Sequence, residues 1–170
     1  MKAVVLALLA TPAFAEEPTM QINPDWEYVA DTVMGGVSTG HITHAQVQGR
    51  VATRLTGQVS LDNNGGFVQM AFDLQQDASD WTGVEIDVIG NGEVYELRAR
   101  TDQLTRPWQS FRAEFTAPQE WTAVRIPFGD LTPRKTDATF DPAQLRRLGI
   151  VAIGREFAAD IAVSGLRFYR

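Results

Sequence analysis

The chain has 170 residues, of which 44% are apolar and 21% are charged, close to the averages of globular proteins. This composition excludes a disordered or collagen-like chain, and the length excludes a large multidomain enzyme. The net charge of −6 disfavours nucleic acid and anionic membrane surfaces as partners. The sequence has no cysteine, so disulfides, thiolate nucleophiles and cysteine-based metal sites are excluded.

The start of the chain has the pattern of an export signal. Lys2 supplies a positive charge, residues 3–10 form a short apolar run, and residues 13–15 (Ala-Phe-Ala) match a small-x-small cleavage site. A membrane anchor or buried helix is the weaker interpretation, because the run is far shorter than the roughly 20 residues that a membrane span needs. We expect cleavage after Ala15 and a soluble mature protein, periplasmic or secreted, that starts at Glu16.

Alternation of apolar and polar residues predicts β-strands along most of the mature chain. The predicted strands cover residues 51–59, 68–74, 84–88, 95–99, 111–115, 124–128, 148–154 and 161–169. Turn signals separate the strands at intervals of roughly 10 to 15 residues, which is typical of an all-β sandwich. The plain interpretation of the Asn63-Asn64-Gly65-Gly66 signal is a hairpin turn, because Asn and Gly tolerate positive φ.

One segment, residues 141–148, has a helical pattern. Asp141 would be its N-cap and Pro142 its first helical residue, with Leu145 and Leu148 facing the core. The sequence therefore predicts one antiparallel β-sandwich domain over residues 16–170, with one or two short helices.

Two glycine-rich segments stand out as candidate functional loops. Residues 31–40 read Asp-Thr-Val-Met-Gly-Gly-Val-Ser-Thr-Gly, and the adjacent glycines predict positive φ or a close backbone approach. A phosphate-binding loop is disfavoured, because no Gly-Lys-Ser/Thr ending and no helix follow. The second segment, residues 62–67, starts like a calcium loop but lacks the rest of an EF-hand pattern.

We expect the two segments to pack together near one edge of the sandwich. Asp31 would accept hydrogen bonds from loop amides, Ser38 would cap the opposite side, and Gly36 would have positive φ. In the alternative, the loops form a ligand or partner site. Its candidate residues are Asp31, Met34, Gly35, Gly36, Ser38, Asn64, Gly65 and Gly66.

The two segments also carry a family resemblance. Residues 26–38 (Trp-Glu-Tyr-Val-Ala-Asp-Thr-Val-Met-Gly-Gly-Val-Ser), followed by residues 64–67 (Asn-Gly-Gly-Phe), resemble the complex I intermediate-associated protein 30 family. Residues 90–101 are similar to the family's Gly-Asp-Gly…Tyr…Leu…Arg strand pair, and residues 111–128 to its Phe…Trp-x-x-Val-x-Ile-Pro-Phe segment. The ordered set covers nearly all of residues 23–170.

The resemblance implies a jelly-roll β-sandwich of the galactose-binding-like type and a non-catalytic role. Mitochondrial members of this family are assembly factors for NADH:ubiquinone oxidoreductase and act on the matrix side, whereas an exported protein would lie on the opposite face of the membrane. Similar sandwiches also serve as carbohydrate-binding modules. Residues 155–160 replace the family's usual Gly-Pro-Phe before the last strand, and Asn91 replaces a common Asp.

A charged strand face offers a second candidate site. Glu96, Arg98 and Arg100 share one face of a predicted strand, and Arg112 and Glu114 could lie on its neighbour. The plain interpretation is a set of cross-strand ion pairs. Alternatively, the face binds an acidic or polyhydroxylated ligand, because arginine presents a planar fork of donors.

Aromatic side chains could complete such a ligand site. Trp108 and Trp81 could stack on sugar rings, although a jelly roll also uses tryptophan in its core. The candidate binding residues from this region are Arg98, Arg100 and Trp108.

Signals for catalysis, metal and cofactor are weak. His41 and His44 would share a face on a helix but point to opposite faces of a strand, which disfavours a metal site. The sequence has no recognisable Gly-x-Ser-x-Gly nucleophile elbow, because the Gly-Val-Ser-Thr-Gly run of residues 36–40 is not followed by a helix. Nothing singles out a carboxylate pair either. We therefore expect no catalytic, cofactor-binding or metal-binding residues.

These observations predict an exported, non-catalytic binding or assembly module. Its partner would be one or more proteins, including a membrane-associated complex. The alternative is a carbohydrate- or small-ligand-binding module of the galactose-binding-like type, with a glycan as ligand.

Overall fold

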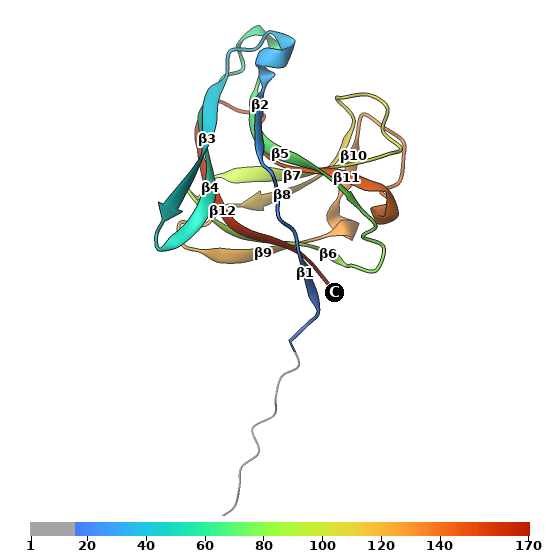
Figure 1. The fold of residues 1–170 in the computed structure, drawn as a ribbon. Coiled ribbons are helices and arrows are strands. Elements are labelled where there is room, and N and C mark those ends of the chain that lie inside the picture. Colours follow the sequence, from blue (N-terminus) through green and yellow to red (C-terminus); the bar gives the residue numbers. More distant parts are fainter. Residues whose placement is uncertain (1–15) are drawn as a thin grey trace, which may run out of the picture.

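A computed structural model describes residues 16–170, which form two antiparallel sheets packed face to face (Figure 1). The first sheet has the order β3 (Thr39–Val47), β4 (Arg50–Val59), β12 (Phe157–Tyr169), β6 (Gly83–Gly90) and β9 (Thr122–Pro127), and β1 (Thr19–Gln21) also pairs with β12. The second sheet has the order β10 (Thr132–Arg134), β8 (Ser110–Thr116), β7 (Val94–Thr101), β11 (Leu145–Ile153), β5 (Phe67–Gln76) and β2 (Glu27–Ala30). The prediction of an all-β sandwich is confirmed. The predicted signal segment lies outside the described residues.

The core lies between the sheets because apolar side chains alternate along the strands. On β7, Tyr95, Leu97 and Ala99 are buried in the core, so the intervening Glu96, Arg98 and Arg100 face outward. Burial of each large side chain contributes roughly 1.5–3 kcal/mol. The outward face of the second sheet is therefore free to carry charged residues.

Two predictions about local structure are wrong. Residues 141–148 do not form an α-helix: a 3₁₀ turn, η4 (Pro142–Gln144), ends where β11 begins, and Leu145 and Leu148 are buried on that strand. The Asp141 cap is confirmed, since its carboxylate accepts a hydrogen bond of 3.0 Å from the Ala143 N–H. Leu145 and Leu148 have helical spacing because a β-bulge between Leu145 and Arg147 interrupts the period of two along the strand.

The Asn63–Gly66 segment is not a hairpin turn. It overlaps a 3₁₀ turn, η2 (Asp62–Asn64), and lies in the connection from β4 in the first sheet to β5 in the second. Asn63 and Asn64 do have positive φ, at 56° and 57°. A third 3₁₀ turn, η1 (Asp31–Met34), follows β2, and a fourth, η3 (Phe128–Asp130), follows β9.

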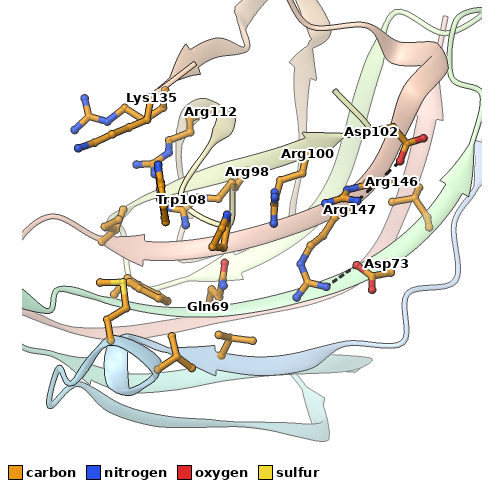
Figure 2. A pocket seen from close by; sticks show the side chains of 18 of the residues that line it. Gln69, Asp73, Arg98, Arg100, Asp102, Trp108, Arg112, Lys135, Arg146 and Arg147 are labelled. Carbon is orange, nitrogen blue, oxygen red and sulfur yellow. Dashed lines mark hydrogen bonds and ion pairs between the residues drawn. The ribbon is translucent and has the colours of Figure 1, made fainter. Parts of the chain in front are cut away.

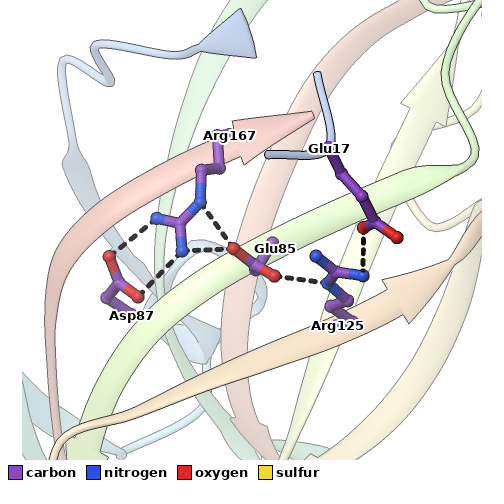
Figure 3. Close-up of polar contacts among 5 residues, drawn as sticks. All are labelled: Glu17, Glu85, Asp87, Arg125 and Arg167. Carbon is purple, nitrogen blue, oxygen red and sulfur yellow. Dashed lines mark hydrogen bonds and ion pairs between the residues drawn. The ribbon is translucent and has the colours of Figure 1, made fainter. Parts of the chain in front are cut away.

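A row of ion pairs crosses the outer face of the first sheet (Figure 3). Glu85 on β6 lies opposite Arg167 on β12 and Arg125 on β9, and accepts hydrogen bonds from both side chains. Arg167 also donates to Asp87 at 2.7 Å, and Arg125 pairs with Glu17 at 2.8 Å. Burial alone would raise the pKa of Glu85, but the hydrogen bonds from the two arginines lower it below its ordinary value.

The two ends of the described chain meet on the first sheet. In the antiparallel pairing of β1 with β12, Thr19 lies opposite Tyr169, next to the C-terminus (Figure 1). Within residues 16–170, no helix has the length and apolar character needed to cross a membrane.

Candidate functional site

The Asp31 cluster (Asp31, Ser38, Gly66 and Phe67) joins the two glycine-rich segments. The Asp31 side chain is fully buried. Its Oδ1 accepts a hydrogen bond from the Ser38 N–H at 3.0 Å, and its Oδ2 accepts from the Ser38 hydroxyl at 2.5 Å and the Gly66 N–H at 2.6 Å. The Phe67 N–H adds a longer bond of 3.3 Å to Oδ2. The expectation that Asp31 accepts hydrogen bonds from loop amides is confirmed.

These hydrogen bonds favour the ionised carboxylate. Burial alone would raise the pKa of Asp31, but the hydrogen bonds from the Ser38 hydroxyl and from the backbone N–H groups of Gly66, Ser38 and Phe67 lower it. The Ser38 hydroxyl also accepts a hydrogen bond of 2.9 Å from the Ser60 N–H. The cluster therefore ties η1 to the ends of β4 and β5.

The glycines pack against this carboxylate in different ways. The expectation of positive φ at Gly36 is wrong, and Gly35 takes that conformation instead, with φ of 87°. Gly36 is constrained by space, since a Cβ there would overlap the Asp31 side chain, and a Cβ on Gly65 would lie 2.5 Å from Asp31 Oδ2. Gly66 has positive φ, at 136°. The cluster is thus closely packed around Asp31.

A groove of about 1330 Å³ runs along the outward face of the second sheet (Figure 2). We call it the arginine groove, because seven cationic side chains of the described chain line it against two carboxylates, Asp73 and Asp102. The cations are Arg98, Arg100, Arg112, Arg134, Lys135, Arg146 and Arg147. A cationic groove on an acidic protein is a local concentration of positive potential, which attracts anions.

Strand register explains why the arginines meet. Arg98 on β7 lies opposite Arg112 on β8, and Arg100 on β7 lies opposite Arg147 on β11. The interpretation of this face as cross-strand ion pairs is confirmed only in part. Arg112 pairs with Glu96 and Arg147 pairs with Asp73 across neighbouring strands, but like charges lie directly opposite each other at the two arginine pairs. The β-bulge in β11 brings Arg146 to the groove as well as Arg147.

The arginines differ in how well they are paired. Arg147 bonds Asp73 at 2.6 Å and also contacts Glu27, and Arg112 donates to the Ser110 hydroxyl at 2.8 Å. Among residues 16–170, Arg98 has one ion-pair partner, the Glu96 carboxylate, at 3.5 Å. Within residues 16–170, its Nε and Nη2 have no hydrogen-bond partner. Burial, followed by repulsion from Arg112, lowers the pKa of Arg98 to about 10, so it is still cationic at neutral pH.

One end of the groove is apolar and exposed. Val33 and Met34 in η1 are 72% and 62% exposed, and Phe67 lies beside them on the groove wall. Trp108, in the loop between β7 and β8, is 57% exposed and also lines the groove (Figure 2). Because Phe67 belongs to the Asp31 cluster, the buried carboxylate positions this end of the groove.

The structure divides the predicted candidate residues into two groups. It brings Met34, Arg98, Arg100 and Trp108 together along the arginine groove. Five others lie in or around the Asp31 cluster, namely Asp31, Gly36, Ser38, Gly65 and Gly66. The remaining two, Gly35 and Asn64, lie at the ends of the 3₁₀ turns η1 and η2.

Sequence reasoning missed several cations of the groove. These are Arg134 and Lys135 around β10, and Arg146 and Arg147 on β11. The Arg146-Arg147 pair was visible in the sequence, but the helical interpretation of that segment placed it elsewhere.

Two other candidates lie outside the groove. Trp81 packs on the core and stacks on Phe168, with ring centroids 6.4 Å apart. His41 and His44 alternate along β3 and therefore point to opposite faces. In the part of the chain that the structure describes, no group of three His, Cys, Asp or Glu side chains is placed to hold a metal ion.

The fold is shared with carbohydrate-binding modules. A family 11 module from Clostridium thermocellum, in complex with a β-1,3-1,4-mixed-linked tetrasaccharide, superposes with a TM-score of 0.73 at 12% identity and covers 91% of this chain and 97% of its own. The family 30 module of the cellulosomal cellulase Cel9D-Cel44B, also from Clostridium thermocellum, gives a TM-score of 0.58 at 18% identity and covers 88% of each chain. At these identities the similarity establishes a shared β-sandwich fold and nothing further.

Sequence comparison identifies the family directly. No curated protein matches the chain. The model of one family, described as complex I intermediate-associated protein 30, matches residues 14–162. This match includes both segments of the Asp31 cluster and most strands of the arginine groove. The chain therefore belongs to the complex I intermediate-associated protein 30 family.

Proposed function

We propose that this protein is an exported, non-catalytic binding module that holds a protein partner in the arginine groove. The observation that carries the proposal is the composition of the groove: an arginine-rich floor ends in the exposed side chains of Met34 and Trp108. Arginine, methionine and aromatic residues are enriched in protein–protein interfaces relative to the rest of the surface. The family's name, which refers to complex I intermediates, supports a role in assembly.

Export determines which partners the protein can meet. The signal pattern of residues 1–15 supports a position outside the cytoplasm, opposite the side on which the mitochondrial relatives act. We therefore propose a partner in the cell envelope, including a membrane-associated complex, in place of the matrix-side assembly role.

The proposal can be tested by photo-crosslinking from the groove. A photo-reactive amino acid at position 108 should crosslink the mature protein to a defined partner in its own envelope, and mass spectrometry would identify that partner. Met34→Ser should abolish the crosslink. Val51→Ser is a matched control, because Val51 is 69% exposed on β4 of the other sheet. Equal crosslinking from position 108 with and without the Met34→Ser substitution would contradict the proposal.

A carbohydrate-binding function is the second candidate. Trp108 favours it, because an exposed indole beside polar groups can stack on a sugar ring. Binding to a glycan array that disappears in Trp108→Ser would favour this alternative over a protein partner.

A further inference from the structure

The floor of the arginine groove holds donors that the protein itself does not use. Among residues 16–170, Arg98 Nε and Nη2 and Arg100 Nε are buried without a hydrogen-bond partner. A buried N–H group that lacks an acceptor is unfavourable by about 1–3 kcal/mol, and more when it is charged. An acceptor supplied from outside would therefore bind favourably here.

The surroundings of Arg98 leave room for such an acceptor. On β11, the residue opposite Arg98 is Gly149, and on β5 the next in line is Ala71. These small residues keep the floor directly beside Arg98 low. The nearest long side chains are Gln69 on β5, whose Oε1 lies 3.5 Å from the position of a Cβ on Gly149, and Arg112 on β8. Figure 2 shows Arg98, Arg100 and Arg112 projecting into the same groove.

The geometry favours a carboxylate as that acceptor. A guanidinium presents a planar fork that matches the two oxygens of a carboxylate. The Glu96 carboxylate lies 3.5 Å from both Arg98 and Arg112 and forms no hydrogen bond through Oε2 to any described residue. One internal carboxylate therefore only partly neutralises the two arginines, and the remaining positive charge faces the groove.

The apolar end of the groove favours a polypeptide as the source of the carboxylate. Val29, Val33, Met34 and Ile153 line it with aliphatic side chains, which suit the aliphatic side chains of a peptide. The aromatic side chains here are Phe67 and the exposed Trp108, so the four aliphatic side chains make up the larger part of this end. A segment that combines acidic and aliphatic residues would fit both parts of the groove.

We propose that Arg98, with Arg100 and Arg112, forms a carboxylate-binding subsite that receives an Asp or Glu side chain from an acidic segment of the partner protein. This inference rests on the proposed function and adds the chemistry of the recognised segment. Arg98 determines specificity, because its fork is the least satisfied by the protein itself. The flanking cations attract the segment, and Met34 and its neighbours bind an aliphatic residue of it.

The test uses poly-L-glutamate as the probe and isothermal titration calorimetry as the assay. Wild type should bind poly-L-glutamate saturably at physiological ionic strength. Arg98→Met and Arg98→Lys should each weaken binding about tenfold or more, since a charge-assisted hydrogen-bonded pair contributes about 1.5–3 kcal/mol and 1.4 kcal/mol corresponds to tenfold. Arg50→Met, which removes one charge from the other sheet, should change affinity less than about twofold.

Several outcomes would overturn the proposal. If Arg98→Lys binds as tightly as wild type, only long-range charge attracts the probe and there is no fork-specific subsite. Binding of polygalacturonate without binding of poly-L-glutamate would assign the groove to an acidic polysaccharide. Absence of binding to either probe would also refute the subsite. Arg98→Met should melt at or above the wild-type temperature, because it removes unpaired buried donors, so lost binding would not reflect unfolding.

The subsite and the proposed function can fail separately. If Arg98→Met still forms the position-108 crosslink with wild-type yield, the partner remains and the carboxylate subsite is wrong. If the crosslink is absent from wild type while poly-L-glutamate binding depends on Arg98, the subsite stands and the protein-partner function is wrong.

Discussion

Replacement of Asp31 by alanine should destabilise the whole domain. The substitution removes the shared acceptor of four donors, namely the Ser38 hydroxyl and the N–H groups of Ser38, Gly66 and Phe67. Asp31 is fully buried, so water cannot replace the carboxylate without a rearrangement of the packed glycines. We therefore expect both the fold and the apolar end of the groove to be affected.

The size of the effect follows from the two shortest hydrogen bonds. Each donor left buried and unpaired is unfavourable by about 1–3 kcal/mol, and partial relaxation reduces the sum. The free energy of unfolding should therefore fall by about 3 kcal/mol. For a domain of this length, 1 kcal/mol shifts the melting temperature by about 2–4 °C, so we expect a decrease of about 6–12 °C.

Thermal and urea unfolding followed by far-UV circular dichroism would measure this change. Asp62→Ala is the matched control, because Asp62 is an exposed carboxylate in the neighbouring 3₁₀ turn and its replacement should alter stability by less than about 0.5 kcal/mol.

Asp31→Asn adds a pH test. Since the folded-state pKa of Asp31 lies below its unfolded value, its charge stabilises the fold above about pH 4, and this contribution is lost as pH falls through the folded-state pKa. The deficit of Asp31→Asn relative to wild type should therefore be complete at pH 7 and shrink in acid.

A different result would refute this reasoning. If the melting temperature of Asp31→Ala lies within about 1 °C of wild type, the carboxylate does not hold the loops together. A shift of that size is typical of a neutral surface substitution. Loss of partner binding in that same stable variant would make the Asp31 cluster a recognition site in its own right.

Three further predictions concern other parts of the chain. Gly65→Ala should reduce the free energy of unfolding by about 1–3 kcal/mol because its Cβ would crowd Asp31, whereas Gly129→Ala, with open space around it, should be nearly neutral. Urea titration would compare the two variants, and equal stability would contradict the packing argument. Glu85→Ala should reduce the free energy of unfolding, measured in thermal melts, by about 2 kcal/mol, since it removes the shared partner of two arginines. Asp160 forms a half-exposed pair with Arg54, so Asp160→Ala should lower the free energy of unfolding by no more than about 1 kcal/mol. N-terminal sequencing of the exported protein should start at residue 16, and a full-length cytoplasmic product would restore the assembly role on the other face of the membrane.

The strands of the sandwich were predictable because burial imposes a period of two. Tyr95, Leu97 and Ala99 must face the core, and this requirement alone places Arg98 and Arg100 on the outer face of the sheet. Strands β1, β2, β3 and β10 escaped prediction. Three of them have only three or four residues, too few to establish a period, and the nine residues of β3 include few apolar side chains.

The groove could be predicted only in part, because it depends on pairings between distant strands. The sequence showed that Arg98 and Arg100 share a face, but Arg147 joins them through a register between β7 and β11 that no local pattern encodes. The buried role of Asp31 was more accessible. A carboxylate beside two glycines indicates a crowded loop. Only the structure shows that Gly36 is required by steric overlap with Asp31 and not by a positive φ.

Because Thr19 on β1 lies opposite Tyr169 on β12, the domain is suitable for insertion into another protein. Because its two ends lie side by side on the first sheet, and the arginine groove is on the outward face of the second, the domain could be inserted into a surface loop of a host protein with short linkers. Circular permutation that joins the present ends and opens the chain elsewhere should be tolerated for the same reason. The arginine groove would then face away from the host in either arrangement.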